Sequence, residues 1–94
     1  MIIVAGHLVI AAADRERFVA RSSEAVRLAR AARGCHDFAV SPDAVDPERV
    51  NVFERWEDRA SLQAFRGKGP SDDLGRMITS FHVADYDVLS STKA

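Results

Sequence analysis

The stretch RVNVFERWEDRASLQAFR, residues 49–66, passes directly from a strand pattern into a helix pattern. Residues 49–57 alternate between two faces, as the side chains of a strand do. The two faces carry Val50, Val52, Glu54 and Trp56 on one side and Asn51, Phe53 and Arg55 on the other. Asp58 is placed to cap a helix over Arg59–Arg66, with Leu62 and Phe65 as its buried pair. This stretch therefore predicts a strand that is followed at once by a helix.

Residues 2–12 form a second strand pattern, and this strand is apolar on both faces. One face carries Ile2, Val4, Leu8 and Ile10, and the other carries Ile3, Ala5 and Val9. A strand of this kind has to be covered on both sides. We expect the larger side chains, Leu8 and Ile10, to face the first helix.

A long amphipathic helix is predicted next, from a cap at Asp14 to about Arg33, where Gly34 stops it. Cys35–Val40 is a short strand, and residues 41–47 have the turn composition of a hairpin loop. We expect the core between helices and sheet to contain Phe18, Val26, Leu62 and Phe65.

The last third of the chain predicts a helix break at residues 67–70 and a short helix capped by Ser71. That helix carries Leu74, Met77 and Ile78 on one face, and Phe81–Leu89 is the last strand. The element order is β-α-β-β-α-β, so we predict one α+β domain over residues 1–94, with an antiparallel ferredoxin-like sheet. Two main helices cover one face of such a sheet. A second copy is expected to cover the open face, giving a homodimer.

Composition narrows the classes of partner. Lys and Arg nearly cancel Asp and Glu, for a net charge of −1, which argues against a nucleic-acid partner. A single cysteine excludes an intrachain disulfide and a cysteine-based metal site. We find no apolar run of about 20 residues for a membrane span and no signal-peptide pattern, so we expect no membrane partner and a reduced cytoplasmic location. The Ala, Arg, Asp and Val content is typical of a GC-rich bacterial genome.

The chain resembles the antibiotic-biosynthesis-monooxygenase family of dimeric α/β barrels. The resemblance lies in the first strand and its helix, in Gly34-Cys35-His36-Asp37-Phe38, and in the aromatic-Glu-x-Trp signature of Phe53-Glu54-Arg55-Trp56. It implies the ferredoxin-like fold and a range of activities that includes quinone-forming oxygenases, heme degraders and isomerases. The heme-degrading relatives carry an Asn where this chain has Gly6, and a His after the Trp that this chain lacks. Heme degradation is therefore not expected.

Six residues are candidates for a site. His7 is the candidate general base because its ordinary pKa lies near neutral pH, and we expect it to reach Trp56 or Tyr86. Arg76 and Tyr86 are candidates to stabilise a substrate oxyanion. Trp56 at the rim of an apolar cavity, Glu54 and Val52 are candidates to bind the substrate. Each also has a structural interpretation, as a core residue, an ion-pair partner or a solvated side chain.

The leading functional hypothesis is a cofactor-independent monooxygenase that acts on a small aromatic or polycyclic phenol. A base, an oxyanion stabiliser and a dry flat pocket suffice for that chemistry, so no metal or cofactor is expected. Val52 stands where quinone-forming relatives carry an Asn, so the resemblance to that branch is incomplete. The alternatives are an enzyme that isomerises or breaks down a small oxygenated metabolite, and a non-enzymatic dimeric binding or stress protein.

Overall fold

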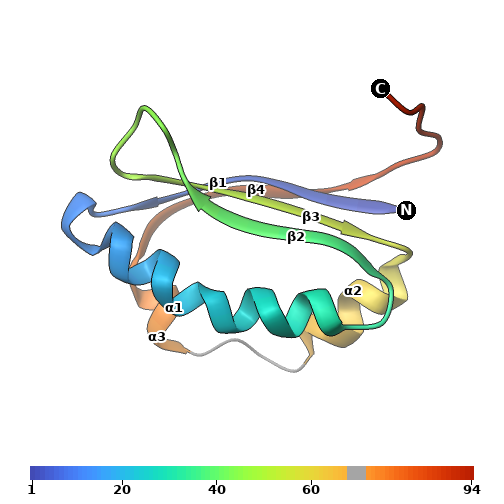
Figure 1. Cartoon of the computed structure of the whole chain (residues 1–94), viewed down its shortest axis with the longest axis horizontal. Helices are drawn as coiled ribbons and strands as arrows, with labels where there is room; N and C mark the ends of the chain where they lie inside the picture. The colour runs from blue at the N-terminus through green and yellow to red at the C-terminus, as the bar shows by residue number, and fades with distance from the viewer. Residues whose placement is uncertain (68–71) are drawn as a thin grey trace.

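The protein is a four-stranded antiparallel sheet with helices on one face (Figure 1). The computed structural model describes residues 1–67 and 72–94, except for the side chains of residues 72 and 73. The elements in chain order are β1 (Ile2–Ile10), α1 (Ala12–Ala31), β2 (Cys35–Pro42), β3 (Arg49–Trp56), α2 (Arg59–Arg66), α3 (Asp72–Arg76) and β4 (Ile78–Asp87). The strands lie in the order β2-β3-β1-β4. The predicted ferredoxin-like α+β architecture is confirmed.

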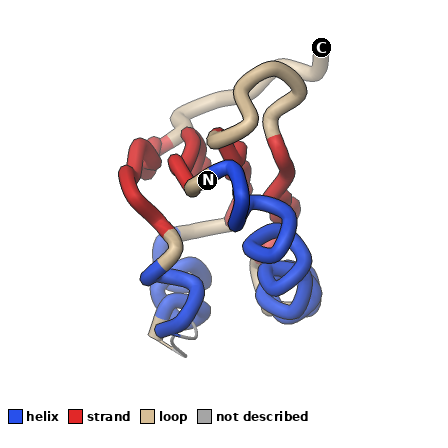
Figure 2. The backbone as a smooth tube through the Cα atoms, turned by 90° about the vertical axis from the view of Figure 1, so that its left-hand side faces the viewer, coloured by secondary structure: helices blue, strands red, loops and turns tan. Residues whose placement is uncertain are grey.

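The helices lie in two columns under the same face of the sheet. α1 packs mainly against β2, whereas α2 contacts β3 and α3 contacts β4. Figure 2 shows the strands in one layer and every described helix beneath it. Among the described helices, none combines the length and apolar composition needed to cross a bilayer.

The alternation of β1 is resolved as the sequence predicts. Ile2, Val4, Leu8 and Ile10 are buried toward the helices. They belong to two separate clusters. Ile2 and Val4 join Ala29, Phe38, Trp56 and Leu62, while Leu8 and Ile10 join Phe18 and Val50. Of the predicted core, Phe18 and Leu62 are buried, and Val26 and Phe65 are partly buried against the first cluster.

Gly6 lies in the middle of β1, opposite Val52 of β3 and Val83 of β4. Its φ of +147° is one that residues with a side chain rarely adopt. A Cβ built there would lie 1.9 Å from the carbonyl oxygen of His82. Glycine therefore lets β4 approach β1 closely, and no side chain fills this position between the two clusters.

Two predicted helix starts have different outcomes. Asp58 caps α2 as predicted, since its carboxylate accepts a hydrogen bond of 2.8 Å from the backbone N–H of Ser61. The prediction for α1 is wrong, because the helix begins at Ala12 and Ala11 holds the N-cap position without a side-chain cap. Asp14 lies in the first turn instead, where its carboxylate accepts from Arg17 at 3.0 Å. β1 ends at Ile10 and leaves only one residue before the helix.

The end of the chain also differs from the prediction. The sequence pattern places Ile78 in the short third helix, but it is the first residue of β4, where it pairs with Ile10. β4 therefore starts three residues before the predicted Phe81, and it ends at Asp87. Over so short a segment, the same apolar residues fit both the spacing of a helix and the start of a strand. Of the predicted break at residues 67–70, the structure describes only Gly67. The predicted cap Ser71 also lies outside the described residues.

We predict that Leu62→Ala lowers the free energy of unfolding by about 2–5 kcal/mol. Leu62 is 0% exposed and lies in the first cluster, so truncation leaves a cavity among side chains that cannot collapse fully. Leu28→Ala is the matched control, since this leucine on α1 is 59% exposed. Its effect should stay within about 0.5 kcal/mol. Urea unfolding monitored by circular dichroism measures both. Equal effects would contradict the packing described for α2.

Candidate functional site

The strand register divides five of the six predicted residues between the two faces of the sheet. Trp56, Glu54 and Val52 lie opposite Ile2, Val4 and Gly6 of β1, so they share the helix-covered face. His7 lies opposite Asn51 and His82, and Tyr86 lies opposite Ile3, so both belong to the open face. Arg76 is the last residue of α3. The structure therefore brings together the three predicted binding residues and separates them from His7 and Tyr86.

The sequence predicts Trp56 at the rim of a cavity, but in the structure Trp56 is buried. Its side chain is 0% exposed, and its ring packs against Phe65 of α2 with the ring centres 5.3 Å apart. Phe65 also makes an edge contact with Phe38, at 5.8 Å between centres. α2 starts only three residues after Trp56 and folds back over it. This depth gives Trp56 a place in the core, and contact with a ligand stays a prediction.

Glu54 is the ionisable side chain of this group and is largely removed from solvent. The indole N–H of Trp56 donates a hydrogen bond of 2.9 Å to its Oε1 atom. Burial raises the pKa of Glu54 above its ordinary value of 4.5, while the Trp56 hydrogen bond and the charge of Arg66 oppose this rise. A carboxyl group in such a setting is a candidate acid or base, because its two protonation states are closer in free energy near neutral pH.

Arg66 brings a cation from the last turn of α2 to the same region. Its Nη1 and Nη2 atoms donate to the two carboxylate oxygens of Asp85 on β4, at 3.0 and 2.8 Å. The hydrogen bond from Arg66 holds the pKa of Asp85 below its ordinary value. Arg59, at the other end of α2, also donates to Asp85, at 3.4 Å. The helix side of the sheet thus holds a carboxyl, a guanidinium and a second carboxylate close to Trp56.

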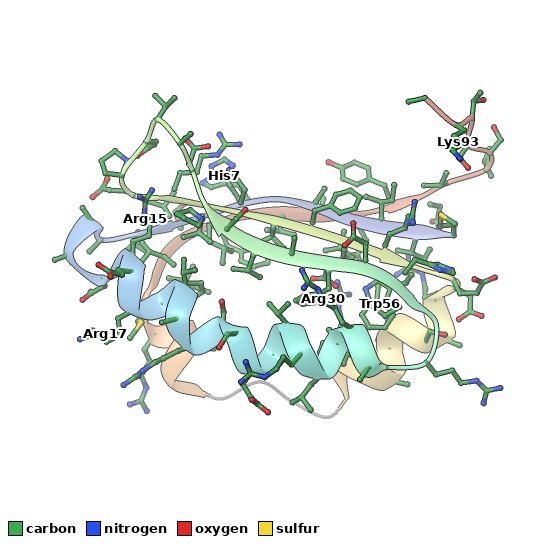
Figure 3. The ribbon with its side chains drawn as sticks, in the orientation of Figure 1. His7, Arg15, Arg17, Arg30, Trp56 and Lys93 are labelled. Carbon is green, nitrogen blue, oxygen red and sulfur yellow. The ribbon has the colours of Figure 1, made fainter. Side chains whose placement is uncertain are left out.

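His7 lies on the face that no described helix covers. Figure 3 shows its ring on one side of the sheet and Trp56 on the other side, next to α2. The ring of His7 stacks on His82, with centres 4.8 Å apart. Partial burial, with Arg49 and His82 nearby, lowers the pKa of His7. The expected contact between His7 and Trp56 is therefore wrong, because the two side chains point to opposite faces.

Tyr86 and Arg76 also lie away from Glu54. Tyr86 shares the open face with His7 but is four residues from His82 along β4, a distance of about 13 Å for a strand. The expectation that His7 reaches Tyr86 is therefore wrong as well. Tyr86 is 55% exposed, and Arg76 is exposed at the end of α3. The oxyanion-stabilising role predicted for each is not supported by proximity to His7 or Glu54.

A shallow hollow lies outside this region, between the start of α1 and the β2–β3 loop. Ala12, Val19, Pro42 and Pro47 form its apolar lining, next to Arg15, Glu16 and Ala20. Arg15 is engaged in holding the loop, since its Nη1 atom donates to backbone oxygens of Asp43, Asp46 and Arg49 at 3.2, 2.7 and 3.3 Å. The hollow contains none of the six predicted residues.

Arg66 and Asp85 were missed by the sequence analysis. Asp85 has the parity of Val83 in β4, so a carboxylate interrupts a helix-facing set, and this was a detectable signal. Arg66 gave no comparable signal, because an arginine in the last turn of a helix is ordinary. Their ion pair joins residues 19 apart in sequence. Only the paired strands and the position of α2 reveal it.

Comparison with known proteins supports a single family. The sequence model described as antibiotic biosynthesis monooxygenase matches residues 1–73. Among curated proteins, no sequence matches this chain.

Solved structures show the same fold. A candidate antibiotic biosynthesis monooxygenase from Nitrosomonas europaea aligns with a TM-score of 0.83 at 15% identity, over 96% of this chain and 100% of its own. A protein from Mycobacterium tuberculosis aligns with a TM-score of 0.81 at 21% identity, over 98% of both chains. A conserved protein from Methanosarcina mazei has a TM-score of 0.81 at 19% identity and covers 90% of this chain and 89% of its own. At these identities the likeness establishes the fold alone.

We predict that Glu54→Gln stabilises the fold relative to the native protein as the pH rises. The folded-state pKa of Glu54 is raised, so the neutral carboxyl stabilises the fold at low pH. This contribution is lost as the pH rises through that pKa. Glutamine stays neutral and its oxygen can still accept from Trp56. The difference in free energy of unfolding should therefore grow in favour of the variant as the pH rises above 4.5, the ordinary pKa of the carboxyl.

Urea titrations at several pH values measure this difference. Glu16→Gln is the control, since Glu16 is exposed on α1. It should not reproduce the trend. A difference between Glu54→Gln and the native protein that is constant with pH would show that Glu54 is not held in an environment that favours its neutral form.

Proposed function

The chain belongs to the antibiotic biosynthesis monooxygenase family, and from this premise we propose a monooxygenase that needs no cofactor and oxidises a small aromatic phenol. The observation that carries the proposal is the partly buried carboxyl of Glu54, which accepts from the Trp56 indole and lies near the Arg66 guanidinium. These groups supply a base and a cation on the helix side of the sheet, among apolar side chains.

Glu54 is the base that the geometry favours. A carboxylate whose pKa is raised by burial takes a proton from an acidic phenol more readily than an exposed one does. Arg66 lies close enough to lower that pKa by its charge, so it is also placed to meet the negative charge that develops on the substrate oxygen. His7, the base predicted from sequence, lies on the other face. The proposal therefore moves the proton transfer to Glu54.

The row of Gly6 is the place that we propose for the ring system. Gly6 contributes no side chain there, and its neighbours Val52 and Val83 are only partly buried. Glu54 belongs to the next row on the same face, two residues along β3. A flat apolar ligand in the row of Gly6 would have its polar group within reach of Glu54. Val52 keeps its predicted role as a contact of the substrate.

The reaction needs only molecular oxygen as a co-reactant. Deprotonation gives an electron-rich anion that reacts with oxygen directly. For a substrate with a CH₂ group between two rings, one oxygen atom becomes the new carbonyl and the other leaves as water. The carbon loses four electrons and the oxygen molecule gains four, so no external reductant is required. The protein binds, deprotonates and excludes water.

We expect Glu54→Gln to reduce oxygen uptake with an anthrone-type phenol by about 10²–10⁴-fold, the range for loss of a general base. An oxygen electrode measures uptake over a range of pH. Glu57→Gln is the matched control, since Glu57 is exposed and paired with His36. It should keep native rates. Native uptake by Glu54→Gln together with loss of uptake by His7→Ala would contradict the proposal and restore His7 as the base.

We further propose that a second copy of the chain covers the open face. Its central row is apolar, with Ala5 flanked by Phe53 and Ala84, and in the next row Ile3 lies between Tyr86 and Arg55. Phe53 and Tyr86 are 38% and 55% exposed in the single chain. A continuous apolar sheet face is typically buried in an oligomer. Lowering of the His7 pKa favours its neutral form, which suits a covered face.

Light scattering at micromolar concentration should give the mass of two chains, and Phe53→Glu should give the mass of one. The reason is that a charge at the centre of the contact would be desolvated without a partner. Leu28→Glu is the control because Leu28 is exposed on α1, on the helix side, and this variant should remain a dimer. A native protein with the mass of one chain would overturn the proposal.

A further inference from the structure

Both ends of α2 are tied to one carboxylate on β4. Arg59, the first residue of the helix, donates to Asp85 at 3.4 Å, and Arg66, the last, donates to both of its oxygens at 3.0 and 2.8 Å. Two parallel hydrogen bonds orient a guanidinium more strictly than a single one. Asp85 therefore determines where the charge of Arg66 lies.

Asp85 and Glu54 flank Val4 in one row across the helix-covered face. Glu54 of β3 and Asp85 of β4 are both paired with Val4 of β1. Neighbouring strands are about 4.8 Å apart, so the two acidic residues are about 10 Å apart across the sheet. Arg66 approaches this row from α2. Within the described residues, it forms its ion pair with Asp85 and none with Glu54.

We propose that Asp85 is a positioning residue that holds Arg66 beside Glu54 without letting it neutralise Glu54. The cation then remains available to the oxyanion of a ligand, while the carboxylate remains a usable base. Without Asp85, Arg66 would turn toward Glu54 as the nearest remaining anion, and both groups would be lost to the ligand. This inference rests on the proposed use of Glu54 as the base.

The charged and titratable surroundings of Glu54 are few. Arg66 faces it from α2 and Asp85 from β4, and the two have opposite effects on its pKa. Burial raises the pKa of the Cys35 thiol of β2, and the nearby charge of Glu54 adds to this rise. From α1, the Nε of Arg30 donates to the backbone oxygen of Phe38, the β2 partner of Glu54. β1 contributes only apolar Val4. Arg66 is therefore the cation whose position matters.

Trp56 provides a direct reporter of Glu54. It is the only tryptophan in the chain, and its indole N–H donates to the Glu54 carboxyl. Protonation of Glu54 weakens this hydrogen bond and changes both the fluorescence of Trp56 and the chemical shift of its indole N–H. A pH titration of either signal gives the midpoint of Glu54, and Glu54→Gln should abolish that transition. The reporter needs no substrate.

The experiment compares this midpoint between variants. Asp85→Asn should move the midpoint to lower pH, because the negative charge of Asp85 is removed and the released Arg66 turns toward Glu54 and stabilises its charged form. Arg66→Gln should move it to higher pH, because the cation is removed. In the absence of Arg66, Asp85→Asn should have a much smaller effect. General loosening of α2 would instead move both single variants in the same direction.

Three further variants complete the test. Arg59→Gln is the matched control, since it removes the other contact of α2 with Asp85 and should shift the midpoint less than Asp85→Asn does. Asp85→Glu keeps the acceptor and should restore most of the native midpoint. Arg66→Lys keeps the charge but cannot form the two-point pair. It should lower the midpoint even if Asp85→Asn does not fold.

The outcomes separate this inference from the proposed function. The positioning role is overturned if neither Asp85→Asn nor Arg66→Lys changes the midpoint of Glu54. It is also overturned if these variants move the midpoint to higher pH, as Arg66→Gln is expected to do. Loss of oxygen uptake in every protein, with the midpoints shifting as expected, overturns the proposed reaction and leaves the positioning role intact. Where uptake occurs, the acidic limb of its pH profile should shift with the Trp56 midpoint in each variant.

Discussion

The fold depends on one constraint, which is that β1 lies between two other strands and carries apolar side chains on both faces. Strand alternation sends Ile2, Val4, Leu8 and Ile10 toward the helices and leaves Ile3, Ala5 and Val9 on the other side. A shift of one residue would exchange the two sets and expose the larger ones. The register of β3 and β4 follows from β1, and with it the face on which every candidate residue lies.

The same constraint explains what sequence could and could not predict. Element types and the face of each β1 side chain follow from local periodicity, and α2 was placed correctly because Asp58 and Gly67 mark its ends. The relation between His7 and Trp56 depends on which residues pair between β1 and β3. That pairing is non-local, and local alternation does not show it. The depth of Trp56 was missed for a related reason, since it depends on Phe65 folding back over the indole.

The open face and the helix face have different physical demands. On the open face, His7 stacks on His82 beside the apolar row of Ala5, and partial burial together with the nearby charge of Arg49 lowers the pKa of His7. On the helix face, Glu54, Arg66 and Asp85 form a polar group next to the core cluster that contains Trp56 and Leu62. Polar side chains near a core need partners, and here the partners come from β3, α2 and β4. The helix face is therefore the one that combines burial with ionisable groups.

Retention of a carboxyl at Glu54 has a thermodynamic cost, because its raised pKa means that ionisation at neutral pH is less favourable in the folded chain than in the unfolded one. A domain of 94 residues has little stability to spare. An apolar side chain would fill the same place next to Val4 and Phe38 without that cost. The indole of Trp56 offsets part of the cost through its hydrogen bond, and Arg66 offsets part through its charge. Arg66 is itself held by Asp85, so three side chains from three elements serve to keep one carboxyl in the layer between sheet and helices. Packing alone does not require such an arrangement, whereas the proposed proton transfer from a phenol to Glu54 does.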